Sequence, residues 1–356
     1  MNVLDYMERN GHEQVAVYAD KAVGLRAFIA IHDTTLGPAV GGVRIWNHPT
    51  EETAMTDVLR LSRAMTYKSA AAGLHFGGGK ALIMADRANK TEAMMRSFGR
   101  FVESLGGRYV TTEDVGMTLL DLEWIGRETK HVLGLPSSMG GSGDTSPMTG
   151  YGVYMGMQAC AREELRSTSL DGRTIAIQGY GNTARALVRN IQENHPSVKL
   201  VITDVNEEAL DKARDVKGAT IVGSDEIYDV ECDIFAPCAL GGVLNGDTIP
   251  RLRCQIICGS ANNQLLELEH GEAIQRRGIL YAPDYIVNAG GVINISCESR
   301  NGYSESAAVE KTARIYDTIE QVIAISKKSD ISTARAANKL AEERIASVKK
   351  VRNSYR

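Results

Sequence analysis

The sequence predicts an α/β protein of two domains, the second of which is a doubly wound parallel sheet. The chain has 356 residues, enough for about two ordinary domains. Apolar segments of strand and helix character alternate through its second half. A glycine-rich turn stands between a strand-like and a helix-like segment near residue 180. We therefore expect a first domain at residues 1–140 and a second at residues 145–325.

The strongest local signal is this turn and its two flanking segments. Residues 173–178 form a β-branched run typical of a buried strand, and residues 183–192 continue as a helix. The turn reads Gly179-Tyr180-Gly181-Asn182-Thr183-Ala184. In a G-x-G-x-x-A turn the first glycine makes the tight bend, the second lets the backbone approach a pyrophosphate, and the third small residue packs helix on strand. The start of the helix, including Asn182, then offers N–H groups to phosphates.

A carboxylate follows at the expected distance. The apolar segment 199–203 is a second strand, and Asp204 comes 20 residues after Ala184. An acid there accepts hydrogen bonds from the ribose hydroxyls and repels a 2′-phosphate, which favours NAD over NADP. Further apolar runs at 233–237, 255–258 and 278–281 extend a parallel sheet.

Composition argues against several classes of protein. The net charge is −4 with no long basic run, so we expect no nucleic-acid partner and no membrane partner but a small molecule. The first nine residues mix acids and bases, unlike a signal peptide, and no apolar run reaches 18 residues, which predicts a cytoplasmic protein. Six cysteines without a C-x-x-C pair, and seven histidines without metal-ligand spacing, predict reduced thiols and no metal. Glycine alone is unusual, at 35 residues, about one in ten where about 7% is ordinary.

In the first domain, strand-like segments at 14–18 and 25–31 precede a helix that starts after Thr50. Four apolar residues at helical spacing predict the buried face of this helix: Ala54, Val58, Leu61 and Met65. The next position on that face is Lys68, which either snorkels at the helix end or lies in a cavity.

A second lysine follows three glycines. Gly77–Gly79 precede Lys80 and an apolar strand. The spacing is not that of a phosphate loop, because Leu74 stands where that motif needs glycine and Ala81 where it needs Ser or Thr. We expect the glycines to let the backbone pass close to a ligand. If Lys80 shares a cavity with Lys68, repulsion and burial lower the pKa of the amines, and a neutral amine can act as a base.

Two acids end another predicted strand. Residues 108–112 are strand-like and lead into Glu113 and Asp114, which either cap a helix or form a proton relay with Lys80. The Gly/Ser/Pro-rich segment 136–147 is a candidate hinge between the domains. The C-terminal segment 332–356 is predicted as an amphipathic helix that packs back on the first domain or forms a subunit contact.

Six motifs together resemble the glutamate/leucine/phenylalanine/valine dehydrogenase family, in order and over nearly the whole length. They lie at residues 31–44, 65–68, 77–80, 112–116, 260–265 and 283–292. The resemblance implies a substrate domain and a Rossmann-type NAD domain with a cleft between them, assembled as a homo-oligomer, an octamer or a dimer. It also implies reversible, NAD-dependent oxidative deamination of an L-amino acid to the 2-oxo acid and ammonia.

The resemblance also implies roles for individual residues. Lys80 would be the general base and Asp114 the proton shuttle. Lys68 would bind the substrate α-carboxylate. Five further residues would complete these sites: Asn288 and the backbone of Gly41 and Gly42 on the carboxylate side, and Thr149 and Asn262 near the nicotinamide. A carboxylate-binding cation, a basic amine and an acid are what deamination requires.

Substrate choice follows from the pocket that the resemblance implies. Val40 stands where glutamate-specific members have a lysine, and Val292 and Ile295 would form the far wall, so a glutamate side chain would be buried without a partner. Members that act on leucine usually have Leu in place of Val40 and Ala in place of Thr112, and this chain departs at both positions. We expect a branched aliphatic substrate (Leu, Val or Ile), with Phe or Trp as the alternative. A non-catalytic NAD-binding sensor and a 2-hydroxyacid dehydrogenase are alternatives from other classes.

Overall fold

The computed structural model describes residues 2–299 and 302–354, and the chain divides into two compact units. The first unit comprises Met1–Asp144, Ile295–Glu305 and Ala341–Arg356, and the second comprises Thr145–Asn294 and Ser306–Leu340. This division differs from the expected domain bounds in two respects. Residues 332–340, expected to pack back on the first domain with the rest of the C-terminal helix, belong to the second unit. Residues 295–305, and with them Ile295, belong to the first unit although their place in the sequence put them in the second domain.

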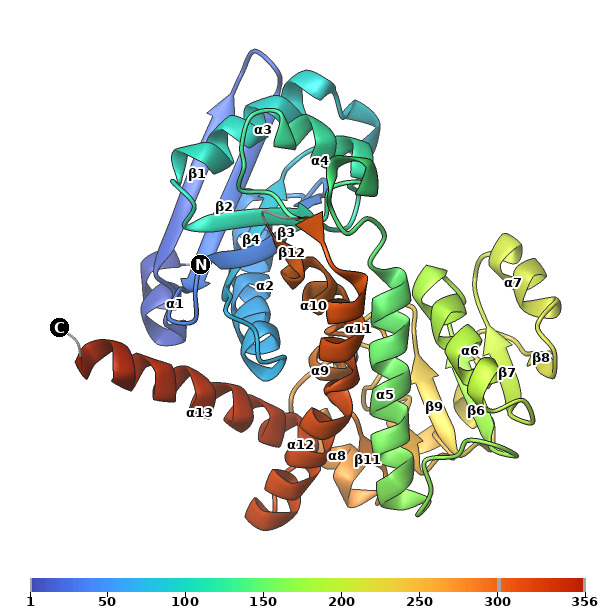
Figure 1. Ribbon diagram of the computed structural model, residues 1–356. Coiled ribbons are helices and arrows are strands. Elements are labelled where there is room, and N and C mark those ends of the chain that lie inside the picture. The colour runs from blue at the N-terminus through green and yellow to red at the C-terminus, as the bar shows by residue number, and fades with distance from the viewer. Residues whose placement is uncertain (1, 300–301, 355–356) are drawn as a thin grey trace. The chain divides into compact units, whose positions relative to one another are not determined.

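The first unit is built on a five-stranded sheet of order β1-β2-β4-β3-β5, in which β1, β2 and β4 are antiparallel and β4, β3 and β5 are parallel (Figure 1). Its elements are α1 (Val3–Asn10), β1 (Gln14–Asp20), β2 (Leu25–Asp33), β3 (Ala39–Ile45), α2 (Glu51–Ala71), β4 (Gly77–Ile83), α3 (Glu92–Ser104), β5 (Tyr109–Glu113) and α4 (Leu119–Gly126), with a short hairpin of β12 (Glu298–Ser299) and β13 (Gly302–Tyr303). Helices α3 and α4 pack in the core on one face of the sheet, and α2 packs on the other.

The buried face of α2 differs from the predicted one. Ala54 and Val58 are fully buried as expected, but Leu61 and Met65 are only half-buried, and the buried face continues instead through Ser62, Thr66 and Ser69. The reason is the closeness of β4. A Cβ added to Gly78 would lie 2.1 Å from Thr66 Oγ1 and 2.5 Å from the Ser62 carbonyl oxygen, so only small side chains fit on that face of α2. Lys68 therefore lies half-buried on the flank of α2, not on its buried face.

The second unit contains a six-stranded, wholly parallel sheet of order β11-β10-β9-β6-β7-β8. Its elements are α5 (Ser146–Glu164), β6 (Thr174–Gln178), α6 (Asn182–Asn194), β7 (Lys199–Thr203), α7 (Glu207–Arg214), β8 (Ala219–Ile221), β9 (Ile234–Pro237), β10 (Ile256–Ile257), α8 (His270–Arg276), β11 (Leu280–Tyr281), α9 (Asp284–Val287), α10 (Gly290–Ser296), α11 (Glu305–Ala313) and α12 (Ile315–Ser329). Counted from β6, the strand order is 3-2-1-4-5-6, that of doubly wound dinucleotide-binding sheets, which confirms the predicted fold class. Strand β8 was not predicted, because a run of three residues is too short to show periodicity.

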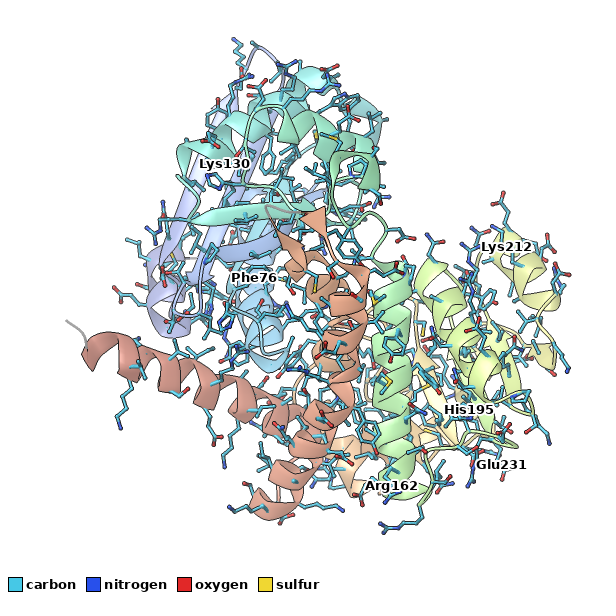
Figure 2. All side chains as sticks on the ribbon, in the orientation of Figure 1. Phe76, Lys130, Arg162, His195, Lys212 and Glu231 are labelled. Atoms are coloured by element: carbon cyan, nitrogen blue, oxygen red, sulfur yellow. The ribbon has the colours of Figure 1, made fainter. Side chains whose placement is uncertain are left out.

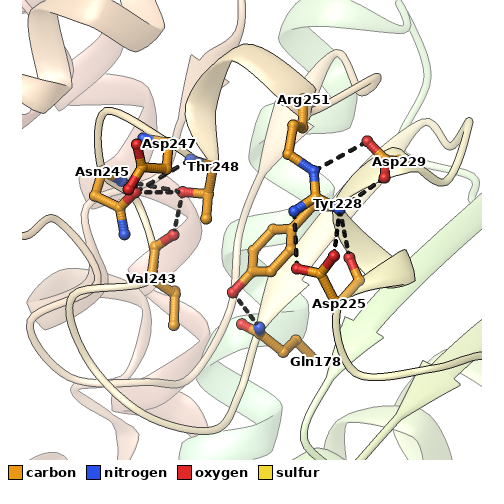
Figure 3. Close-up of polar contacts among 9 residues, drawn as sticks. All are labelled: Gln178, Asp225, Tyr228, Asp229, Val243, Asn245, Asp247, Thr248 and Arg251. Carbon is orange, nitrogen blue, oxygen red and sulfur yellow. Dashed lines mark hydrogen bonds and ion pairs between the residues drawn. The ribbon is translucent and has the colours of Figure 1, made fainter.

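Polar contacts support the central strand β6 and the helices beside it. Gln178, the last residue of β6, donates to the Tyr228 hydroxyl at 2.6 Å, and the Arg251 guanidinium lies 5.3 Å from the centre of the Tyr228 ring while bonding to Asp225 and Asp229 (Figure 3). His195, at the end of α6 (Figure 2), is buried; its Nδ1 accepts the N–H of Leu170. These groups have structural partners and are not part of the predicted chemistry.

Helix α13 (Thr333–Ser354) continues from the second unit into the first. Within the first unit, Ala341, Ile345 and Val348 pack with Leu36 and Ala70. Arg344 donates to the carbonyl oxygens of Ser69, Ala70 and Leu74, and so provides hydrogen bonds for the C-terminal end of α2. None of the helices in the described part of the chain is long and apolar enough to span a membrane.

Candidate active site

A buried ion pair joins two of the predicted catalytic residues. Lys80 is only 5% exposed in the middle of β4, and its Nζ lies 3.0 Å from Asp114 Oδ2, just beyond the end of β5. Arg44, near the end of β3, donates from Nε to the same oxygen at 3.0 Å. The carboxyl ends of the parallel strands β3 and β5 thus bring the Asp114 carboxylate into contact with two cations, Arg44 and Lys80.

Burial alone would raise the pKa of Asp114. The positive charges of Lys80 and Arg44, together with the hydrogen bonds that they donate, have the larger effect and lower this pKa below its ordinary value. Asp114 is therefore ionised at neutral pH. The alternative interpretation of Glu113 and Asp114 as a helix cap is wrong, because α4 is capped by Thr118 in a capping box with Asp121.

Glycines make this approach of strands and side chains possible. A Cβ on Gly42 would lie 2.6 Å from the Asp114 Cβ, and a Cβ on Gly41 would lie 1.7 Å from the Gly79 carbonyl oxygen. A Cβ on Gly79 would lie 2.7 Å from the ring of Tyr109. The 77–79 backbone, predicted to lie close to a ligand, lies close to other parts of the chain itself. Hydrogen bonding of a substrate to the Gly41 and Gly42 backbone stays a prediction.

The register of the sheet places the predicted pocket residues beside this ion pair. Gly42 pairs with Thr112, and Arg44 pairs with Leu82. Because alternate residues of a strand share a face, Val40 and Thr112 lie on the same face of the sheet as Lys80. Val40 is fully buried and Thr112 is 8% exposed. An apolar and a hydroxyl side chain therefore share the face of the sheet that carries the Lys80 side chain.

In the second unit, the glycine turn has the features of a pyrophosphate-binding turn. Gly179 has φ +95°, and a Cβ there would lie 2.7 Å from the Ala239 Cβ, whereas a Cβ on Gly181 would meet no atom within 4 Å. Ala184 is buried against the sheet as predicted, and no side chain caps the start of α6, whose first N–H groups are left for a ligand phosphate. Asn182, the first residue of α6, accepts a hydrogen bond from Arg185 through Oδ1.

Asp204 is half-buried at the end of β7, beside the glycine turn. Its Oδ2 accepts the N–H of Tyr180 at 2.6 Å, and its Oδ1 accepts the N–H of Asn206 at 2.8 Å. The acid is thus fixed at the carboxyl edge of the sheet, where such folds bind dinucleotides. The open space at Gly181 and the uncapped helix start fit a dinucleotide.

Two other predicted residues of the second unit meet directly. The buried Asn288 donates from Nδ2 to Asn262 Oδ1 at 2.8 Å and to the Ser260 carbonyl oxygen at 3.1 Å. Thr149, on α5, lies against α10, because a Cβ on Gly291 would be 3.0 Å from Thr149 Oγ1. Val292 on α10 is buried, and Ile295 is a buried residue of the first unit.

Arg44 was not predicted as a site residue, and it has a second partner besides Asp114. Arg44 Nη1 lies 3.0 Å from Asp57 Oδ2 on α2, and His48 Nε2 lies 3.5 Å from that same oxygen. The alternation Val40, Gly42, Arg44 along a strand is the signal that places Arg44 on the face of the site. Nothing local in the sequence indicates Asp57. In the part of the chain that is described, no group of three His, Cys, Asp or Glu residues is arranged to hold a metal ion.

The parallel sheet with its glycine turn, together with an α/β unit carrying a buried lysine–carboxylate pair, defines a dinucleotide-dependent oxidoreductase. Two family models match the chain: Glu/Leu/Phe/Val dehydrogenase, dimerisation domain, over residues 12–131, and Glutamate/Leucine/Phenylalanine/Valine dehydrogenase over residues 140–204 and 197–353. The chain belongs to this family and is an amino-acid dehydrogenase.

Relatives agree over the full length. The chain is 52% identical to the leucine dehydrogenase of Geobacillus stearothermophilus over 356 residues, all of this chain and 96% of the relative. It is 43% identical to the phenylalanine dehydrogenase of Caldalkalibacillus thermarum, covering 97% of this chain and 94% of that one. The crystal structure of L-tryptophan dehydrogenase from Nostoc punctiforme matches with a TM-score of 0.85 at 44% identity, covering 98% and 99% of the two chains. The family and the parallel sheet together indicate a nicotinamide cofactor.

Proposed function

We propose that this protein catalyses the reversible, NAD-dependent oxidative deamination of a branched aliphatic L-amino acid (leucine, valine or isoleucine) to its 2-oxo acid and ammonia. The observation that carries the proposal is the buried contact of 3.0 Å between Lys80 Nζ and Asp114 Oδ2, in a chain 52% identical to a leucine dehydrogenase. A lysine held against a carboxylate is a pair through which a proton can pass, which deamination requires at a water molecule and at the leaving amine.

In this mechanism Lys68 binds the substrate α-carboxylate, and Lys80, in its neutral amine form, removes a proton from the water that attacks the iminium carbon. Asp114 accepts that proton from Lys80 and later returns it for the departure of ammonia. Its pKa, lowered by Lys80 and Arg44 against the effect of burial, keeps it in the form that can accept. The low exposure of Lys80 limits bulk water around the base.

The residues of the second unit that would hold NAD are those of the glycine turn and its surroundings. The backbone of Gly179, Gly181 and the start of α6 would bind the pyrophosphate, and Asp204 would bind the ribose hydroxyls. Thr149 and Asn262 would lie near the nicotinamide. Bound by these residues, NAD would supply the acceptor for the hydride that leaves the substrate Cα. The carboxylate of Asp204 disfavours a 2′-phosphate, and this favours NAD over NADP.

Preference for a branched aliphatic side chain rests on the character of the residues near Lys80. Val40 is fully buried and apolar, so a glutamate carboxylate placed there would lose its hydration without gaining a partner, at a cost of several kcal/mol. Val292 and Ile295 are proposed as the far wall. Phenylalanine and tryptophan are the alternative substrates, because relatives named for them are 43% and 45% identical. We further propose that the protein works in the cytoplasm as a homo-oligomer, in line with the description of the first family model as a dimerisation domain.

The test is a panel of Leu, Val, Ile, Phe, Trp and Glu, assayed for kcat/KM with NAD and with NADP. We expect the three aliphatic substrates with NAD to lead, and Lys80→Ala to abolish turnover while NADH binding is retained. Absence of turnover with every amino acid would favour a non-catalytic sensor. NADH consumption with a 2-oxo acid in the absence of ammonium would instead favour a 2-hydroxyacid dehydrogenase.

A further inference from the structure

Arg44 stands between the catalytic carboxylate and helix α2. Its guanidinium uses two different nitrogens: Nε contacts Asp114 Oδ2 at 3.0 Å, and Nη1 contacts Asp57 Oδ2 at 3.0 Å. The side chain is 23% exposed, and those of Asp114 and Asp57 are 21% and 26% exposed, so both pairs are largely shielded from water. A planar, rigid fork is suited to holding two carboxylates at fixed positions.

Asp114 needs such a partner because of where it lies. It follows the last residue of β5, and its Cβ occupies the space that a side chain at Gly42 would take. The loop from Asp114 to the cap of α4 at Thr118 is short and includes Gly116 at φ +86°. A carboxylate at a strand end is otherwise free to turn about its χ angles. The contact with Lys80 alone would not fix it, because a lysine ammonium is a point charge that accepts many directions of approach.

We propose that Arg44 is a positioning residue for the proton relay: anchored on α2 by Asp57, it holds the Asp114 carboxylate in the orientation that receives the proton from Lys80. This inference rests on the proposed function, since it assigns Arg44 a role in the same proton transfer. Both cations contact Oδ2. Oδ2 is therefore the oxygen placed to receive the proton from Lys80.

Arg44 also supplies charge, and its two contributions are separable. The charged and titratable groups facing Asp114 are Lys80 from β4, Arg44 from β3, and Glu113 and the buried Tyr109 from β5. Asp57 and His48 face Arg44 from its other side. Removing the Arg44 charge leaves Asp114 buried with one cation fewer, which shifts its titration toward higher pH. Removing only the contact between Arg44 and Asp57, the tether, leaves the titration of Asp114 unchanged but disturbs the orientation of its carboxylate.

The experiment measures kcat and KM for leucine from pH 5 to 10 in the wild type, Arg44→Met, Arg44→Lys and Asp57→Asn. Arg44→Met is expected to move the acid limb of kcat upward by about one pH unit, because an adjacent opposite charge lowers a carboxyl pKa by about that much or more. It is also expected to lower the plateau kcat about tenfold with KM changed less than twofold. Arg44→Lys restores the acid limb but only part of kcat, since lysine keeps the charge without the fork.

Arg108→Met is the matched control. Arg108 forms an ion pair with Glu13 at 3.0 Å in the same unit, and its side chain is 53% exposed and away from Asp114. We expect the wild-type pH profile in this variant. If Arg44→Met does not fold, Arg44→Lys and Asp57→Asn decide the question: both lower kcat about threefold without moving the acid limb if the tether orients Asp114.

Two different failures are distinguishable. No ammonia-releasing turnover by the wild type rejects the proposed function and the role of Arg44 with it. Turnover by the wild type together with a wild-type plateau kcat in a folded Arg44→Met variant, or wild-type kcat in both Arg44→Lys and Asp57→Asn, overturns the positioning role alone.

Discussion

The glycines of the first unit's sheet and those of the turn after β6 are alike in sequence but face different surroundings. Where Gly41, Gly78 and Gly79 lack a Cβ, the space is filled by the protein itself, at distances from 1.7 to 2.7 Å. At Gly181 that space is empty to 4 Å. A glycine cluster therefore marks close approach to a backbone, but only the tertiary structure shows whether another part of the chain or a ligand makes that approach. Gly179, in the same turn, resembles the glycines of the sheet, because the space beside it is filled by Ala239, and it also has a positive φ.

Gly41→Ala should have the largest effect. The new methyl group would lie 1.7 Å from the Gly79 carbonyl oxygen, and neither strand can move without breaking the sheet. We expect the first unit to lose about 5 kcal/mol or more, which amounts to loss of folded protein. Both tryptophans, Trp46 and Trp124, belong to this unit, so the tryptophan fluorescence of the purified variant measures the loss. A native emission spectrum at 25 °C would contradict this expectation, because it would show that the sheet accommodates a side chain at Gly41.

Acid should destabilise the first unit next most strongly, through His32. Burial lowers the pKa of His32 from 6.5 to about 4, and the hydrogen bond to the Asn10 carbonyl oxygen, which raises this pKa, offsets only part of the effect. Its Nε2 donates to the Asn10 carbonyl oxygen, and Nδ1 accepts from Thr66, the residue packed on Gly78. The unfolded chain therefore binds a proton below pH 6.5 that the folded chain refuses until about pH 4, and stability falls by about 3 kcal/mol as pH drops through that interval.

Urea unfolding followed by tryptophan fluorescence at pH 7 and pH 4.5 tests this expectation. The midpoint for the wild type should fall on acidification, and His32→Gln, which does not titrate there, should show a smaller fall. An equal pH dependence in both proteins would assign the acid sensitivity to other groups, such as His12, whose pKa is also lowered by burial.

Gly179→Ala should have an intermediate effect, confined to the second unit. Alanine at φ +95° is strained, and its Cβ would lie 2.7 Å from that of Ala239, for a total of about 2 kcal/mol. Hydrogen exchange should quicken in the peptides that contain β6 and α6, while the tryptophan transition of the first unit stays at its wild-type midpoint. Unchanged exchange in β6 would show that the turn relaxes without cost.

Gly181→Ala should leave stability within about 0.5 kcal/mol of the wild type, because its Cβ meets nothing. If the empty space is the position of the pyrophosphate, the methyl group should weaken NADH binding about tenfold or more, a change of about 1.4 kcal/mol. NADH fluorescence titration measures the affinity, and Gly246→Ala, another glycine with nothing within 4 Å of its Cβ, is the control. Wild-type affinity in Gly181→Ala would remove the distinction between the two kinds of glycine.

Much of the second unit was predictable because its signals are local. The strand, turn, helix, strand and acid from residue 173 to Asp204 fall within one stretch of sequence, and the structure has each element within about two residues of its expected place. The face of α2 was not predictable in the same way. Its periodicity favoured Leu61 and Met65, but the glycines of β4 bring the two backbones so close that Ser62 and Thr66 take the buried positions.

The sequence by itself determined the fold class of the second unit, the family of the chain, and which lysines and carboxylates are available for chemistry. Periodicity, turn residues and motif spacing are properties of neighbouring residues, and they can be read without knowing the rest of the fold. Only the tertiary structure decided that Lys80 meets Asp114, and that Arg44 joins Asp114 to Asp57. These contacts link residues on β4, β3, α2 and the end of β5, and their geometry is set by strand register and by the packing of a helix on a sheet.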